Sequence, residues 1–236
     1  VIGYLFWIAV FAGFIFVGFK IARRGWRPSK NEQAFLRWAA ADGWTVVLEP
    51  EQVSWAGLLP GRKTGAVRML LSRTVGGREL CVADYRYSTR RSPGLLDGGR
   101  RVGPPMRNHH YVAGWVRLPG EYPPVTVGRP DRLGWIDDVL DVNLDRLADR
   151  YLGPRQVPSG DPEFDARFAL QAYDPAAAFT VVGPALRRAM LAGEVPTTWQ
   201  VKGADLVTWR SGSFTEPQVI VNLANGVLRV AELIGR

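Results

Sequence analysis

The sequence predicts an α+β protein: one N-terminal transmembrane helix followed by a soluble domain with a mainly antiparallel sheet and flanking helices. Three observations predict it. Residues 1–19 carry no charge, as a membrane span requires. Two β-rich runs, Ala66–Val75 and Arg78–Ser88, are joined by Gly76-Gly77, which is typical of a hairpin. Helical periodicity follows the strands and does not alternate with them, which disfavours a parallel sheet.

The first nineteen residues, VIGYLFWIAVFAGFIFVGF, are followed by a basic stem. A span needs about 20 apolar residues, and Lys20 can reach the interface so that Ile21 and Ala22 complete it. The positive residues behind the run are Lys20, Arg23, Arg24, Arg27 and Lys30. A cleaved signal peptide carries its positive charge before the apolar run, so we expect a retained anchor. By the positive-inside rule, we expect an inner (plasma) membrane protein with its N-terminus outside and its domain cytoplasmic.

The predicted organisation is an anchor with basic stem at 1–24, a linking helix at 25–43 and a cytoplasmic α+β domain at 44–236. Within the anchor, Ala9, Ala12 and Gly13 place small residues on one face. That spacing lets a second transmembrane helix approach closely. The alternative is a chance pattern in a helix that serves only as a tether.

The N-terminal half of the domain is predicted to be mostly extended. Before it, a capping box at Ser29-Lys30-Asn31-Glu32 starts a helix that runs to about Asp42 and stops at Gly43. Strands are then expected at Trp44–Leu48, Ala66–Val75, Arg78–Ser88, Asn108–Leu118 and Val125–Val127. Arg78–Ser88 is apolar on both faces near its start, which favours a central, buried strand. Pro119-Gly120 is expected to end the strand before it, and Pro50–Gly65 is expected to be a loop carrying Trp55.

The C-terminal half is predicted to be mostly helical. Apolar spacings of three and four favour a helix over 131–153, although Val139–Leu144 could instead be extended. Asp174-Pro175 is an N-cap followed by proline, and Gly183-Pro184 separates the helix it starts from the next one. A hairpin made of Trp199–Val201 and Leu206–Trp209 follows, then a strand at Gln218–Val221 and a closing helix at Leu223–Ile234.

The net charge of +8 is concentrated in the stem and in one central segment. Residues 62–107 hold eleven Lys/Arg against three Asp/Glu. The arginines around the central loop are Arg90, Arg91, Arg100, Arg101 and Arg107. Since the stem places the domain at an anionic leaflet, lipid headgroups are the nearest polyanion. No nucleic acid is expected, because the loop lacks interleaved aromatic residues and a recognition motif. The alternative is a plain solvated loop.

No residue pattern points to catalysis, a metal or a cofactor. His109 and His110 are adjacent on a predicted strand and therefore point to opposite faces, one expected to be buried and the other exposed. Cys81 is the single cysteine, which excludes an intramolecular disulfide and favours a buried filler. A row of carboxylates could hold a divalent ion, but a solvated acidic helix face is favoured. Its members are Asp138, Asp141, Asp145 and Asp149. We therefore expect a protein that is not an enzyme and has no cofactor.

Three stretches carry a resemblance to a known family: VIGYLFWIAVFAGFIFVGFKIARRG at the start, then ELCVADYRY, then PEFDARFALQAYDP. With these, the chain resembles the trehalose monomycolate transport factor family of the mycobacterial cell envelope. The last stretch also resembles uncharacterised single-span bacterial proteins. The resemblance implies a non-enzymatic accessory role beside an RND-type exporter of a trehalose glycolipid. Two other classes stay open: a membrane-tethered domain that binds a ligand or anionic lipid with another partner, and an enzyme acting on an envelope precursor.

Overall fold

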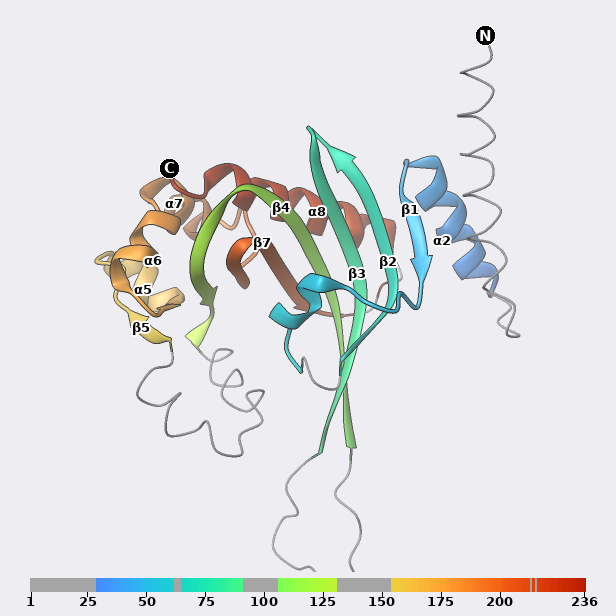
Figure 1. Cartoon of the computed structure of the whole chain (residues 1–236), viewed down its shortest axis with the longest axis horizontal. Helices are drawn as coiled ribbons and strands as arrows, with labels where there is room; N and C mark the ends of the chain where they lie inside the picture. Colours follow the sequence, from blue (N-terminus) through green and yellow to red (C-terminus); the bar gives the residue numbers. More distant parts are fainter. Residues whose placement is uncertain (1–28, 62–64, 91–105, 131–153, 213, 215) are drawn as a thin grey trace, which may run out of the picture.

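The computed structural model describes residues 29–61, 65–90, 106–130, 154–212, 214 and 216–236. In these residues the chain forms a seven-stranded antiparallel sheet with flanking helices, which confirms the α+β class and the antiparallel sheet (Figure 1). No helix within the described residues has the length and apolar character needed to cross a bilayer. The predicted anchor at 1–24 and the predicted helix over 131–153, with its carboxylate row, lie outside the described residues.

The strands are β1 (Thr45–Leu48), β2 (Ala66–Val75), β3 (Arg78–Arg90), β4 (Met106–Gly128), β5 (Arg155–Val157), β6 (Ala169–Ala172) and β7 (Trp199–Ser211). The helices are α2 (Lys30–Ala41), α5 (Pro162–Arg167), α6 (Pro175–Val181), α7 (Pro184–Leu191), α8 (Pro217–Leu233) and the 3-10 turn η1 (Ser54–Leu58). The sheet order is β1-β2-β3-β4-β6-β5, and β7 pairs with β4. Every strand therefore connects, directly or through one or two neighbours, to β4.

The elements set by local signals form as predicted. Ser29 caps α2, and its side chain and that of Glu32 complete the reciprocal capping box. Gly76 and Gly77 both have positive φ, of 56° and 77°, which the tight turn between β2 and β3 requires. Asp174 caps α6 ahead of Pro175, and α7 starts at Pro184. β3 is buried along most of its length, as expected for a central strand.

Four expectations for the chain after residue 118 are wrong, and the first three concern β4, β7 and β5. β4 does not stop at Pro119-Gly120 but continues to Gly128, because register shifts between Arg117 and Val125 remove those residues from the regular ladder with β7. β7 is one strand and not a hairpin, with Gly203 at positive φ where the register shifts. β5 comes from residues for which no strand was expected.

The predicted strand at Gln218–Val221 is instead the first part of α8. The buried residues of this helix recur at helical spacing, and they are Ile220, Leu223, Ala224, Val227, Val230, Ala231 and Leu233. Packing of this apolar face on the sheet outweighs the β preference of Val219, Ile220 and Val221. Leu223 lies against Gly114, where an added Cβ would come within 3.2 Å of it.

The sheet has an apolar core on each face. The larger core lies between the sheet and the helices, and α2 contributes Phe35 and Ala39 to it. The smaller core lies on the opposite face and contains Trp55, Leu59, Trp115 and Trp209. Residues 49–61, named here the strap, cover this second core, with η1 at their centre. We call the two sides the helix face and the strap face.

Candidate functional site

The clearest departure from a plain sheet is a two-stranded projection. The first residue of β2, Ala66, pairs with Arg86, and β7 ends opposite Tyr111. Beyond these positions β3 and β4 continue as a pair to Arg90 and Met106. We name residues 86–90 and 106–110 the ribbon. Figure 1 shows the ribbon extending past the rest of the sheet.

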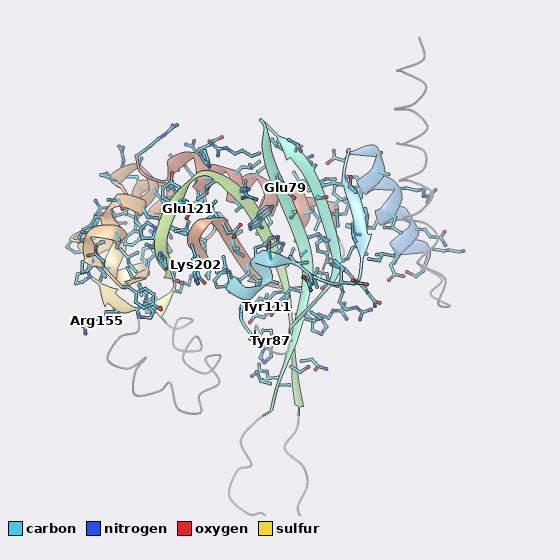
Figure 2. All side chains as sticks on the ribbon, in the orientation of Figure 1. Glu79, Tyr87, Tyr111, Glu121, Arg155 and Lys202 are labelled. Carbon is cyan, nitrogen blue, oxygen red and sulfur yellow. The ribbon has the colours of Figure 1, made fainter. Side chains whose placement is uncertain are left out.

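The strap face of the ribbon carries a stack of aromatic rings. The Tyr87 ring lies 4.5 Å from the His109 ring and 5.7 Å from the Tyr111 ring, with interplanar angles of 8° and 14°. Figure 2 shows Tyr87 and Tyr111 together at the base of the ribbon. Thr89 Oγ1 lies 2.9 Å from His109 Nε2, within hydrogen-bonding distance. The stack gives a two-stranded segment the cross-strand packing that it lacks from further strands.

The strap holds the base of this stack in place. The Tyr85 hydroxyl donates a 2.7 Å hydrogen bond to the carbonyl of Pro60. Trp55 stacks on Trp115 with ring centroids 6.0 Å apart and an interplanar angle of 9°. Burial raises the pKa of the Tyr85 and Tyr87 phenols, so both keep their protons. Trp55, which the sequence places in a loop, is only 3% exposed and is a core residue.

The helix face of the ribbon is polar. Arg86 Nη2 donates to Asp84 Oδ2 at 3.0 Å, and Ser88 donates to the side-chain oxygen of Asn108 at 2.8 Å. His110 is exposed on this face, opposite His109. The prediction that the two histidines point to opposite faces is confirmed, although His109 is half-buried and not fully buried. Alternation along two strands therefore gives the ribbon one aromatic and one polar face.

The predicted basic residues divide between described and undescribed parts of the chain. Arg107 is exposed on β4, Arg90 ends β3, and Lys30 is exposed at the start of α2. The remaining basic residues, Lys20, Arg23, Arg24, Arg27, Arg91, Arg100 and Arg101, lie outside the described residues, as do Ala9, Ala12 and Gly13. Arg90 and Arg107 occupy adjacent rows near the end of the β3–β4 ladder.

The remaining candidate groups are the thiol of Cys81 and the side chains that could bind a metal. Cys81 is 3% exposed in the second core, and burial raises the pKa of its thiol to about 12, which makes it a poor nucleophile. Among the described residues there is no group of three or more His, Cys, Asp or Glu side chains placed to hold a metal ion. The absence of a catalytic or metal role remains a prediction.

The ribbon and the start of α2 share one side of the molecule. β1 pairs from Thr45↔Ser72 to Leu48↔Met69 and therefore runs toward the Ala66 end of β2, where the ribbon begins. A tight turn at 42–44 joins α2 to β1, and the helix runs back in the opposite direction (Figure 1). The first turn of α2 thus faces the same way as the ribbon.

The titration of His109 gives a testable pH dependence. Burial lowers its pKa, and the positive charges of Arg107 and His110 lower it further. When the pH falls below the ordinary histidine pKa of about 6.5, the His109 ring becomes protonated in the unfolded chain but stays neutral in the folded chain until the pH is lower. Stability is therefore lost as pH falls through about 6.5 toward the lower folded value. We expect His109→Gln to flatten this part of the curve of unfolding free energy against pH.

An independent measurement tests the same cause. Arg107→Gln removes one of the positive charges that lower the His109 pKa, so the NMR titration midpoint of the His109 ring should rise. An unchanged midpoint in this variant, together with an unchanged pH slope in His109→Gln, would contradict the assignment.

The sequence contains a signal for the aromatic stack that composition alone does not reveal. Tyr85 and Tyr87 are two residues apart on one strand, and His109 and Tyr111 are two apart on the next. Residues spaced by two share a face. The two pairs come together through the antiparallel register of β3 and β4, in which Tyr85 pairs with Tyr111 and Tyr87 with His109.

Comparisons with known proteins give one distant likeness. No model of a protein family matches the chain, and no curated protein sequence matches it. Among solved structures, the chain is similar to the crystal structure of the mycobacterial trehalose monomycolate transport factor A, TtfA, with a TM-score of 0.46 and 9% sequence identity. The similarity covers 83% of this chain and 87% of that one. At these values the likeness carries no argument about function or about individual residues.

Proposed function

We propose that the chain is a membrane-anchored accessory protein, without enzymatic activity of its own, that acts with an integral membrane lipid transporter. In the finer form of the proposal, the transporter is of the RND type and the exported lipid is a trehalose glycolipid, trehalose monomycolate. The finer form is supported by the sequence resemblance described above. The coarser form is supported by the arrangement of the domain.

The observation that carries the proposal is the shared direction of α2 and the ribbon. α2 begins at Lys30, directly behind the basic stem, and its residues Phe35 and Ala39 belong to the domain core. Phe35 also packs against Phe214 with ring centroids 5.5 Å apart. A chain anchored before residue 30 would bring the start of α2 close to the membrane, and the ribbon would then point to the same membrane surface. Such a placement suits a protein that docks on a membrane neighbour.

The predicted anchor supplies the contact surface in this proposal. Lipid gives helices no hydrophobic reason to associate, so contact depends on close packing at small residues. Ala9→Leu with Gly13→Leu raises hydrophobicity and keeps insertion, yet fills the predicted packing face. Phe11→Trp with Phe14→Trp is the control, because it also adds bulk to the predicted helix but on the side opposite Ala9 and Gly13.

The test is affinity purification of the full chain from its native membrane, followed by mass spectrometry. We expect a multi-span lipid transporter to copurify with the wild-type chain and with the control, and to be lost with the Ala9/Gly13 variant. Full copurification with that variant would show that the anchor is a tether. Absence of any transporter from the wild-type sample would reject the proposed function.

A second candidate is a tethered domain that binds anionic lipid and has another partner. The exposed Arg107 at the ribbon end favours it. Recovery of a partner that is not a transporter, from the same purification, would support this candidate over the first.

A further inference from the structure

We propose that Arg86, His110 and Arg210 form a binding site for the phosphate of an anionic lipid headgroup, at the base of the ribbon on the helix face. The inference rests on the proposed attachment to a membrane and names a lipid contact for it. None of the three residues belongs to the basic loop that the sequence singles out.

The sheet register brings the three side chains together from three neighbouring strands. Arg86 on β3 pairs directly with His110 on β4. Arg210 on β7 pairs with Val112, two residues from His110 on the same strand. Directly paired residues have Cβ atoms about 5 Å apart, and diagonal ones about 7–8 Å, within reach of arginine side chains. All three lie on the face of Val112 and Gly114, and His110 and Arg210 are exposed.

Asp84 fixes the arginine at the centre of this row. Its Oδ2 accepts the 3.0 Å bond from Arg86 Nη2, and the residue is 8% exposed. The Arg86 side chain remains 40% exposed, so its guanidinium is oriented from behind and still accessible from outside. A guanidinium held this way keeps donors for a bidentate contact with phosphate.

The ion pair is poorly satisfied as a purely structural contact. Asp84 Oδ1 and Arg86 Nε are both buried and have no hydrogen-bond partner within the described part of the chain. A pair selected for stability alone would be expected to satisfy these atoms, because unsatisfied buried polar groups are costly. An ion pair that has to present its guanidinium to a ligand is held in one orientation, and that orientation can leave such atoms without a partner.

The surroundings favour an anion and a membrane source. The row of Arg86, His110 and Arg210 brings two guanidinium groups and one imidazole, and Asp84 is the carboxylate paired with it, so the row carries net positive charge. It lies at the base of the ribbon, on the side of the molecule where α2 begins. If that side faces the membrane, anionic lipid headgroups are the phosphates closest to the row. The negative surface potential of the membrane also attracts its basic side chains.

The experiment uses the full chain in uncharged detergent micelles. It is titrated calorimetrically with dihexanoyl phosphatidylglycerol, with dihexanoyl phosphatidylcholine and with inorganic phosphate. We expect phosphatidylglycerol to bind more tightly than either of the other two. Arg86→Gln with Arg210→Gln should weaken that binding by about tenfold or more, since both guanidinium contacts are lost. Arg188→Gln with Lys202→Gln is the charge-matched control on exposed residues elsewhere, and it should stay close to the wild type.

Arg86→Lys keeps the charge and removes the planar fork. We expect it to lose several-fold in affinity, whereas diffuse attraction predicts no change. Any of three results would overturn the headgroup site. The two double variants could lose the same affinity for phosphatidylglycerol, Arg86→Lys could bind it like the wild type, or inorganic phosphate could bind as tightly as phosphatidylglycerol. Thermal unfolding shows whether each variant is folded. If the Arg86→Gln/Arg210→Gln variant is unfolded, the two single variants Arg86→Lys and Arg210→Gln carry the test. Because no transporter is present in this assay, its failure leaves the proposed function standing, and the copurification result does not decide it.

Discussion

Replacing Trp55 by alanine should lower the free energy of unfolding by about 3–5 kcal/mol, the range seen when a large aromatic side chain is removed from a core. Trp55 is 3% exposed and is the main side chain that the strap places over the second core. The loss combines the transfer of the indole to water, the cavity left behind and the stacking on Trp115. Against a typical total stability of about 5–15 kcal/mol, this is a large fraction.

Denaturant unfolding followed by far-ultraviolet circular dichroism measures this effect without relying on tryptophan emission. Phe179→Ala is the matched control, because it also removes an aromatic side chain but from a position that is 47% exposed. We expect the control to change stability by about 0.5 kcal/mol or less. A Trp55 variant as stable as this control would mean that the strap does not hold the second core together.

Replacing Gly65 by alanine should cost about 2–4 kcal/mol, from overpacking and a lost hydrogen bond. A Cβ on Gly65 would overlap the hydroxyl and ring carbons of Tyr85. Tyr85 is 1% exposed, so its ring has little room to move, and its hydroxyl holds the carbonyl of Pro60. The added methyl therefore forces either the tyrosine or the chain beside it to shift, and the link between strap and sheet is lost.

Gly57 provides the control within the strap. A Cβ there meets nothing within 4 Å, so Gly57→Ala should be close to neutral. A double variant sharpens the test. Tyr85→Phe removes the oxygen that the methyl meets, so Gly65→Ala with Tyr85→Phe should be less destabilised than the sum of the two single variants. Strict additivity would show that the two residues do not interact.

Elements fixed by near neighbours in the chain could be predicted from the sequence. The capping box at Ser29, the glycine pair at Gly76-Gly77 and the Asp174-Pro175 start of α6 each depend on two to four consecutive residues. β4 and α8 could not be predicted in this way. Pro119-Gly120 signals a stop, yet pairing on both sides carries β4 past it, and the valines of α8 favour a strand until packing on the sheet is considered.

The same distinction applies to the candidate site. Composition identifies Arg90 and Arg107, because they belong to a locally basic stretch. Arg86 lies in the same basic stretch, but composition does not place it beside His110 and Arg210, because the three become neighbours only through the pairing of β3, β4 and β7. Composition does not reveal the aromatic stack either, because its rings come from the strands that lead into the basic loop and not from the loop itself. Sites assembled by register are visible in a sequence only after the register is known.

The pairing of β4 with β7 has a consequence for how the chain is made. Tyr111 pairs with Ser211 and Val112 with Arg210, so the partner of this β4 edge emerges from the ribosome about one hundred residues later. Until then one edge of β4 has unpaired backbone groups, the arrangement that most readily recruits a wrong strand. Contacts of such long sequence separation also form slowly. Translation that ends before β7 should therefore yield a nascent chain that depends on chaperones, even though every earlier strand is already present.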